Sequence, residues 1–187
     1  LPSGGAIFEF QITPDSSRVV YRGEQNVEGI DEIFSVPMDG GPITQLSIPG
    51  DNTFNYEISP DGSTVVYMTS TGGQGLEELF SVPVLGGEAI RLNAPVPAGE
   101  SVGFFEISTD GRWVTYSTEL IEGEGAPDTA LFSVPIDVGT PIRLTPEFIQ
   151  GSGVGGNSIS PDSSFVVYVA DQDTPGVSEI YAVPIDG

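Results

Sequence analysis

The sequence contains an internal repeat, and this limits its fold more than any other feature. A ten-residue string of the type Ile-Ser-Pro-Asp-Gly-Ser-x-Val-Val-Tyr occurs four times. The four copies are ITPDSSRVVY (12–21), ISPDGSTVVY (58–67), ISTDGRWVTY (107–116) and ISPDSSFVVY (159–168). Their aspartates are separated by 46, 49 and 52 residues. The spacing predicts that the chain folds as four similar units.

Two further strings follow the first. One reads IFSVPMDGG (33–41), LFSVPVLGG (79–87), LFSVPIDVG (131–139) and IYAVPIDG (180–187). The other follows only the first three copies, as ITQL (43–46), AIRL (89–92) and PIRL (141–144). The fourth unit is therefore shorter than the other three.

Each unit has the pattern of short strands separated by turns. Ser-Pro-Asp-Gly suits a type I turn, because Pro fits its second position, Asp its third and Gly its fourth. The Val-Val-Tyr run is typical of a strand, and the Pro of the Phe-Ser-Val-Pro run marks a strand end. No segment has a sustained helical period. We predict an all-β fold of four-stranded antiparallel units, the last of which lacks its outer strand.

The second strand of each unit is apolar at consecutive positions, as at Val65 and Val66, so both of its faces require cover. Four-stranded units of this length that cover one another are the blades of a β-propeller. A β-sandwich would not require four equivalent units. We predict one module over residues 1–187, and its approximate blade bounds are 7–47, 54–93, 103–145 and 156–187.

The Ser-Pro-Asp-Gly turn, the Val-Val-Tyr strand and the LFSVPVLGG-type turn resemble the WD-like propeller repeats of the TolB family. The resemblance covers essentially the whole chain, and it implies a β-propeller in an extracellular or periplasmic bacterial protein. Such repeats build periplasmic TolB-type proteins, prolyl-oligopeptidase-like peptidases and many secreted bacterial proteins. The resemblance therefore implies a fold without implying one function.

Composition excludes several kinds of chemistry. The chain has 27 acidic and 5 basic side chains, all of the latter Arg, and it has no Cys or His. Disulfides, thiolate chemistry, histidine bases and Schiff-base lysines are thereby excluded. The net charge of −22 disfavours nucleic acid and anionic membranes as partners. We expect a scaffold without enzymatic activity. The alternative is the propeller domain of a larger hydrolase, either a glycosidase or a prolyl-oligopeptidase-like peptidase.

Length varies in only two connections of the repeat. From the strand-two Tyr to the strand-three aromatic the chain spans 13, 13, 16 and 13 residues, and from the last Leu to the next unit's Ile it spans 12, 15 and 15. Both connections lie at one end of an up-and-down blade, and variable loops often mark a binding face. Alternatively, this end of the blade tolerates changes in loop length because nothing packs against it. The connections between second and third strands hold 13 of the 27 carboxylates, and the expected binding face comprises Glu24, Glu28, Asp31, Glu119, Glu122, Glu124 and Asp128.

One connection has carboxylates at a spacing that suits a hard cation. Asp171, Asp173 and Glu179 flank Gly176, and Ca²⁺ takes about 6–8 oxygen ligands from flexible loops. The string is shorter than an EF-hand loop, and its residues are also ordinary in hairpins. A calcium site and a solvated hairpin both stay open, and the scaffold role requires no cofactor.

Acidic residues repeated in register are expected to be structural. The turn aspartates, which can bond the backbone of their own turns, are Asp15, Asp61, Asp110 and Asp162. Glu57 and Glu106 occupy equivalent first-strand positions, and a glycosidase needs two carboxylates about 5–9.5 Å apart. We interpret this pair as a product of the repeat.

A closed ring of four such blades would be unusual, and an open arc would expose apolar faces and a strand edge. Three arrangements remove that exposure. The chain is a fragment of a larger propeller, or two copies close one eight-bladed ring, or copies stack head to tail into an open polymer. We expect the partners to be further copies of the chain or another protein.

Overall fold

The computed structural model describes residues 5–70, 76–96, 100–120, 129–148 and 152–187. These residues form fifteen strands and their connections, with no helix among them. The described residues also contain no helix that could span a membrane. The chain divides into two compact units, which are unit 1 (residues 1–91) and unit 2 (residues 92–187).

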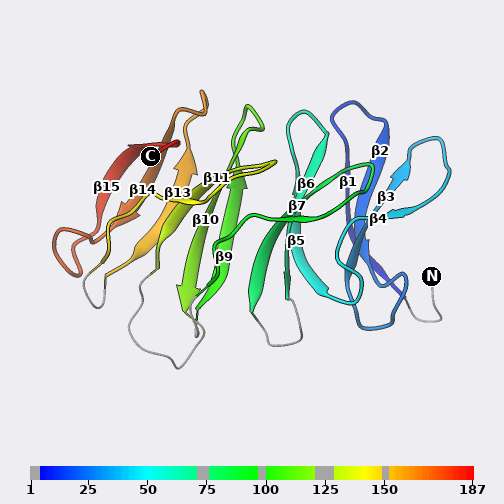
Figure 1. Cartoon of the computed structure of the whole chain (residues 1–187), viewed down its shortest axis with the longest axis horizontal. Coiled ribbons are helices and arrows are strands. Elements are labelled where there is room, and N and C mark those ends of the chain that lie inside the picture. The colour runs from blue at the N-terminus through cyan, green and yellow to red at the C-terminus, as the bar shows by residue number, and fades with distance from the viewer. Residues whose placement is uncertain (1–4, 71–75, 97–99, 121–128, 149–151) are drawn as a thin grey trace. The chain divides into compact units, whose positions relative to one another are not determined.

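Unit 1 consists of two four-stranded antiparallel sheets (Figure 1). The first sheet contains β1 (Ile7–Ile12), β2 (Arg18–Gly23), β3 (Glu32–Pro37) and β4 (Thr44–Gln45). The second contains β5 (Asn52–Ile58), β6 (Thr64–Ser70), β7 (Glu77–Pro83) and β8 (Ile90–Arg91). In both sheets each strand pairs with the next one in the sequence, so the chain runs up and down without a crossover.

Unit 2 repeats this arrangement with one strand fewer among its described residues. Its first sheet contains β9 (Glu100–Ile107), β10 (Trp113–Leu120), β11 (Leu131–Pro135) and β12 (Ile142–Arg143). Its second contains β13 (Val154–Ile159), β14 (Phe165–Ala170) and β15 (Glu179–Pro184). The predictions of an all-β chain and of antiparallel sheets of four, four, four and three strands are confirmed.

The aspartate of the repeated turn holds its turn together in each sheet. In the first turn, the Thr13 hydroxyl donates to Asp15 Oδ1 at 2.6 Å, and the Ser17 N–H donates to the same oxygen at 3.0 Å. In the second, Ser59 and Ser63 bond Asp61 in the same way, at 2.6 and 3.0 Å. The turn is thus a local side-chain-to-backbone motif that the sequence specifies.

The connection between the third and fourth strands is joined to this turn. The Met38 N–H donates to the Ser17 carbonyl at 2.8 Å, and the Val84 N–H donates to the Ser63 carbonyl at 2.8 Å. These connections therefore form one end of each sheet, the turn end. In each sheet the second strand ends, and the third begins, at the opposite end (Figure 1), which we call the loop end.

The core of each unit lies between its two sheets. In unit 1, Val20 and Ile33 of the first sheet pack with Tyr56, Val65 and Phe80 of the second. Here the Tyr56 hydroxyl donates to the Val20 carbonyl at 3.0 Å. The side chain of Tyr56 is almost completely buried, and this burial raises its pKa.

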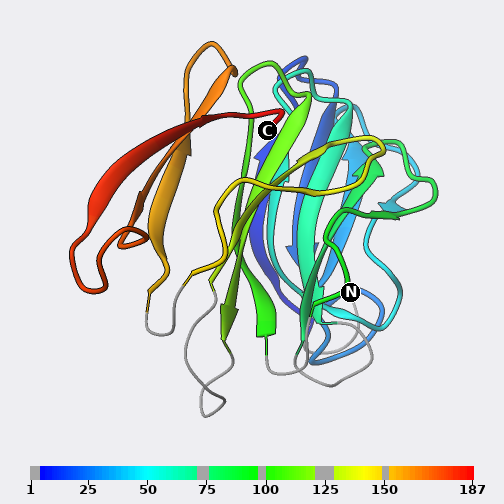
Figure 2. The same ribbon diagram turned by 60° about the vertical axis from the view of Figure 1, so that its left-hand side comes forward.

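In unit 2, Leu131 and Leu144 of the first sheet pack with Val166 and Tyr168 of β14. The strand β14 departs from the expectation that both of its faces are covered. Its residues alternate between buried and exposed along the strand. The reason is that within unit 2 the sheet β13–β15 has a neighbouring sheet on one side only, as Figure 2 shows.

Candidate functional site

The expected binding face begins at the loop end of the first sheet, between β2 and β3. Glu28 is exposed there, while Glu24 and Asp31 are half-buried. Arg22 pairs with Asp31 at 2.7 Å and with Glu9 at 3.2 Å. Burial raises the pKa of Asp31, and the neighbouring Arg22 opposes that rise. Asp31 therefore stabilises the local structure, and Glu24 and Glu28 are the carboxylates of this loop that a partner can reach.

In unit 2, one member of the expected face lies in a described strand. Glu119 is exposed near the end of β10. Glu122, Glu124 and Asp128 lie outside the described residues, so their part in the binding face stays a prediction.

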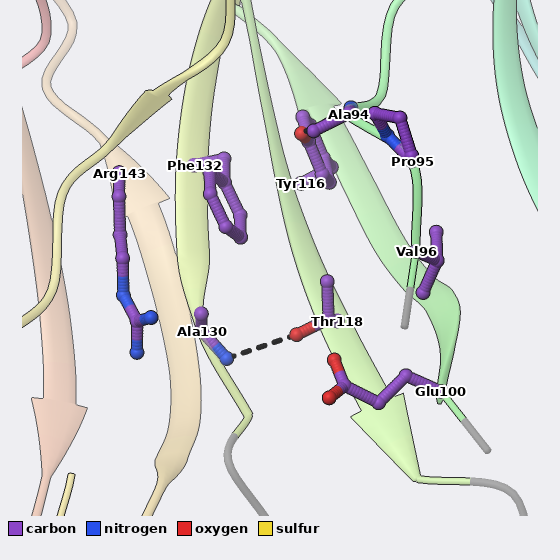
Figure 3. Close-up of a pocket in the computed structure, with 9 residues that line it drawn as sticks. All are labelled: Ala94, Pro95, Val96, Glu100, Tyr116, Thr118, Ala130, Phe132 and Arg143. Carbon is purple, nitrogen blue, oxygen red and sulfur yellow. Dashed lines mark hydrogen bonds between the residues drawn. The ribbon is translucent and has the colours of Figure 1, made fainter. Parts of the chain in front are cut away.

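A cavity of about 200 Å³ opens beside the sheet β9–β12 (Figure 3). The Tyr116 and Phe132 rings are stacked on this side of the sheet with their centroids 5.1 Å apart. Its walls come from every strand of the sheet and from the segment before β9, and they are formed by Ala94, Pro95, Val96, Glu100, Tyr116, Thr118, Ala130, Phe132 and Arg143. The cavity is thus an apolar hollow with charged groups at its edges.

Several of the polar groups around this cavity are already bonded within the chain. The Ala94 N–H donates to the Tyr116 hydroxyl at 3.2 Å. The Ala130 N–H donates to Thr118 Oγ1 at 3.1 Å, as Figure 3 shows. Arg143 donates from Nε to the Thr145 carbonyl at 3.1 Å. Small-molecule sites usually have volumes of about 300–1,000 Å³. The cavity is smaller than this, so it fits one side chain of a partner better than a whole cofactor.

No pattern in the sequence predicted this cavity, although the strands that carry Tyr116 and Phe132 were predicted. One signal was nevertheless present, because 16 residues separate the strand-two Tyr from the strand-three aromatic residue in this unit, against 13 in the other three.

The proposed calcium loop follows β14. Asp171 accepts hydrogen bonds from the N–H groups of Gly153 and Gly176, at 2.8 and 2.7 Å, and these bonds lower its pKa. Glu179 Oε2 accepts a hydrogen bond from the Tyr181 hydroxyl at 3.0 Å. Within the described parts of the chain, no group of three or more acidic side chains is placed to hold a metal ion. The calcium site therefore stays a prediction.

The glutamates considered for glycosidase chemistry have positions in the first strand of their sheets. Glu106 Oε2 accepts a hydrogen bond from the Ile159 N–H at 3.2 Å, and burial raises the pKa of this carboxyl. In unit 1 the equivalent residue, Gln11, donates to the Tyr56 carbonyl at 3.3 Å. This position therefore connects the first strands of neighbouring sheets. Glu57 occupies it in β5, in the other unit from Glu106.

No protein-family model matches the chain, and no curated protein matches its sequence. Solved structures do resemble it. A putative TolB from Agrobacterium tumefaciens is 19% identical with a TM-score of 0.57 over 96% of this chain. The tricorn protease is 16% identical with a TM-score of 0.70 over 95% of it, and oligopeptidase B from Leishmania major is 13% identical with a TM-score of 0.69 over 97%. The fold is a TolB-like propeller fold.

These likenesses are all below 20% identity, so they support the fold and leave the activity open. The chain spans 61% of the putative TolB, 25% of oligopeptidase B and 18% of the tricorn protease. The four sheets are accordingly called blades 1 to 4 from here on, in the order of the sequence.

Proposed function

We propose that this chain is a non-catalytic binding scaffold and that its protein partner contacts the loop end of the blades. One observation supports this most directly. Carboxylates that recur in register, such as Asp15 and Asp61, are bonded within their own turns. Carboxylates near the loop end, such as Glu28 and Glu119, are instead exposed to solvent.

The partner is expected to be basic, with an apolar side chain near its charged groups. Clustered carboxylates attract a cationic partner and speed its association. The cavity beside β9–β12 offers space for one apolar or aromatic group, because stacked Tyr116 and Phe132 form part of its wall. The TolB-like fold also favours a secreted or periplasmic location, which cell fractionation would test.

A labelled deca-lysine peptide tests the acidic part of the proposal, with binding measured by fluorescence anisotropy. The double variant E24Q/E28Q removes two charges from the loop end of blade 1. We expect it to weaken binding about two- to tenfold, the range for exposed charge pairs. The matched control D39N/E88Q removes two exposed charges near the turn end and should change binding less. Equal losses in the two variants would show that only net charge matters and would overturn the proposal.

A pull-down from cell extract with the two double variants then searches for the natural partner. The expected partner is retained by wild type and by D39N/E88Q and is lost with E24Q/E28Q. A partner retained equally by all three proteins would not bind the loop end.

A second candidate function is the propeller domain of a larger hydrolase. It is favoured by the likeness to peptidases of which this chain spans 18% to 27%. It predicts that a longer polypeptide containing this sequence hydrolyses prolyl peptides or oligosaccharides. This candidate function also predicts that removing the loop-end connections of the blades changes which substrates the longer polypeptide hydrolyses. Absence of hydrolysis by the longer polypeptide would remove this candidate.

Calcium binding is proposed separately for the loop after β14. Titration with CaCl₂ should raise the melting temperature, because a ligand at about 100 times its Kd stabilises by about 2.7 kcal/mol. D173N/E179Q should abolish the shift, and E24Q/E28Q should leave it unchanged. A melting curve that is insensitive to both calcium and EDTA would eliminate the site.

A further inference from the structure

Every blade presents two different faces, and the contacts inside the units show which residues each face uses. In unit 1, blade 1 contributes Val20 and Ile33, which are both fully buried against blade 2. In unit 2, the corresponding Leu131 of blade 3 is fully buried against blade 4. We call this the forward face of a blade. Residues of blades 1 and 3 can be matched because their second and third strands pair in the same register. Val20 pairs with Ser35 in blade 1, and Thr115 pairs with Ser133 at the same place in blade 3.

The opposite, backward face uses the first strand. In blade 2, Tyr56 is buried and Ile58 is half-buried against blade 1. In blade 4, the equivalent of Ile58 is Ile159, which is buried against blade 3. A forward face and a backward face therefore make one kind of contact, and this contact occurs once in each unit.

One forward face and one backward face are exposed. On the forward face of blade 4, Val167 and Ile180 are equivalent to Val20 and Ile33, yet they are 39% and 75% exposed. In Figure 2, β13–β15 have the strands β9–β12 of their unit on one side and no described strand on the other. A shallow hollow lies on this face, and its lining includes Val167 and Ile180.

On the backward face of blade 1, Phe10 and Ile12 are equivalent to Tyr56 and Ile58. They are 66% and 51% exposed, whereas Tyr56 is 1% exposed. Large apolar side chains are thus kept at positions whose counterparts inside the units are buried. Contiguous exposed apolar surfaces of this kind mark interaction sites.

We infer that the forward face of blade 4 binds the backward face of blade 1 of a second copy of this chain. The occupant is a second copy because the two exposed faces are the two halves of the blade-to-blade contact found inside each unit. Phe10 of one copy then lies against Val167 and Ile180 of the other, as Tyr56 lies against Val20 in unit 1. The contact is heterologous, so it produces either a closed ring or an open chain of copies.

Charge repulsion opposes this contact, so association of the copies should depend on salt concentration. Each copy carries a net charge of −22, so two copies repel each other at low ionic strength. Added NaCl shortens the Debye length from about 30 Å at 0.01 M to about 3 Å at 1 M. Association should therefore strengthen with salt, the opposite of an association driven by surface ion pairs.

Sedimentation velocity of the 187-residue chain at about 1 to 100 µM tests the inference, since mass action makes oligomers depend on concentration. Wild type should form dimers or larger species, and both F10E and I180E should be monomeric. Matched controls are L85E and V138E, which place the same charge at residues 70% and 68% exposed on third-to-fourth-strand connections. Both controls should associate like wild type. Circular dichroism melts check that every variant is folded.

An equimolar mixture of F10E and I180E distinguishes this contact from a symmetric one. F10E keeps an intact blade 4 face and I180E keeps an intact blade 1 face, so the mixture should form a one-to-one complex that neither variant forms alone. A monomeric wild type at every concentration and salt tested would overturn the inference, as would a mixture that stays monomeric. The inference does not depend on binding at the loop end, because Glu24 and Glu28 belong to neither face.

Discussion

The residue that follows the aspartate in each repeated turn shows how single residues set the local backbone. In blades 2 and 3 this place is held by Gly62 and Gly111, with φ of 77° and 72°. In blades 1 and 4 it is held by Ser16 and Ser163, with φ of 59° and 60°. A side chain in this left-handed region is strained, at a cost of about 1 kcal/mol or more. Replacing either serine by glycine should therefore remove backbone strain.

S16G should stabilise the protein by about 0.5–1 kcal/mol, because glycine adopts this conformation without a steric cost. S163G should gain less or lose stability, because Ser163 Oγ accepts a hydrogen bond from the Asp110 N–H at 3.0 Å. Losing that bond costs about 0.5–1.5 kcal/mol. Urea unfolding of the two variants measures the difference. Equal gains would show that the Asp110–Ser163 bond contributes nothing.

The turn aspartates make the stability of the folded protein depend on pH in the acidic range. Hydrogen bonds from Thr13 and Ser17 lower the pKa of Asp15 to about 2, and those from Ser160 and Ser164 lower the pKa of Asp162 to about 2. A carboxyl with a lowered pKa in the folded state contributes stability above its unfolded pKa of 3.8. This contribution is lost as the pH falls from about 4 towards 2.

D15N/D162N should therefore be less stable than wild type at pH 7, and the difference should shrink as the pH approaches about 2. Urea midpoints measured between these values give the profile. E28Q, which neutralises one exposed carboxyl outside the turns, serves as the control for the loss of charge. A difference for D15N/D162N that is constant with pH would contradict the assignment.

At the scale of elements, an aromatic pair joins the second and third strands of every blade. Tyr21–Phe34, Tyr67–Phe80 and Tyr168–Tyr181 are stacked with ring centroids 5.4, 5.7 and 5.5 Å apart. In the sequence these residues recur at equivalent positions of the second and third strands of each unit. The structure adds that their burial differs, since Phe80 is buried and Tyr181 is half-exposed.

F80A should accordingly cost about 3–5 kcal/mol, the range for truncating a buried aromatic side chain. Y181A should cost clearly less, because part of its ring is already in contact with water. A double-mutant cycle of Y67A and F80A should give a coupling energy of about 0.5–1.5 kcal/mol. These values come from urea unfolding at a fixed protein concentration. Equal costs for F80A and Y181A would show that blade 4 is covered in solution under those conditions.

The charge of the whole molecule sets how its stability responds to salt. The chain has 27 carboxylates against 5 Arg, and folding brings these negative charges close together. The carboxylates therefore repel one another in the folded state, and unfolding reduces this repulsion. Raising NaCl from about 0.01 to 0.5 M should therefore raise the melting temperature by several degrees at pH 7. At the isoelectric pH of about 4.1 the same change in salt should have little effect. A salt response of equal size at both pH values would indicate a cause other than charge repulsion.

The sequence by itself determined the fold class, the number of repeated units and the strand order, because each turn and each strand is specified by neighbouring residues. Pro, Asp and Gly define the turn at residues 59–62, and Val-Val-Tyr defines the strand that follows. It also identified the turn aspartates as structural, since a bond from Ser59 to Asp61 spans only two positions.

Only the tertiary structure decided which of the equivalent residues are buried and which acidic groups a partner can reach. Val20 and Val167 occupy the same repeat position, but the first is covered by a neighbouring blade and the second is exposed. Asp31 is paired with Arg22, whereas the nearby Glu28 faces solvent. Burial and pairing depend on what the rest of the chain brings alongside a residue, and a repeated local sequence carries no information about that.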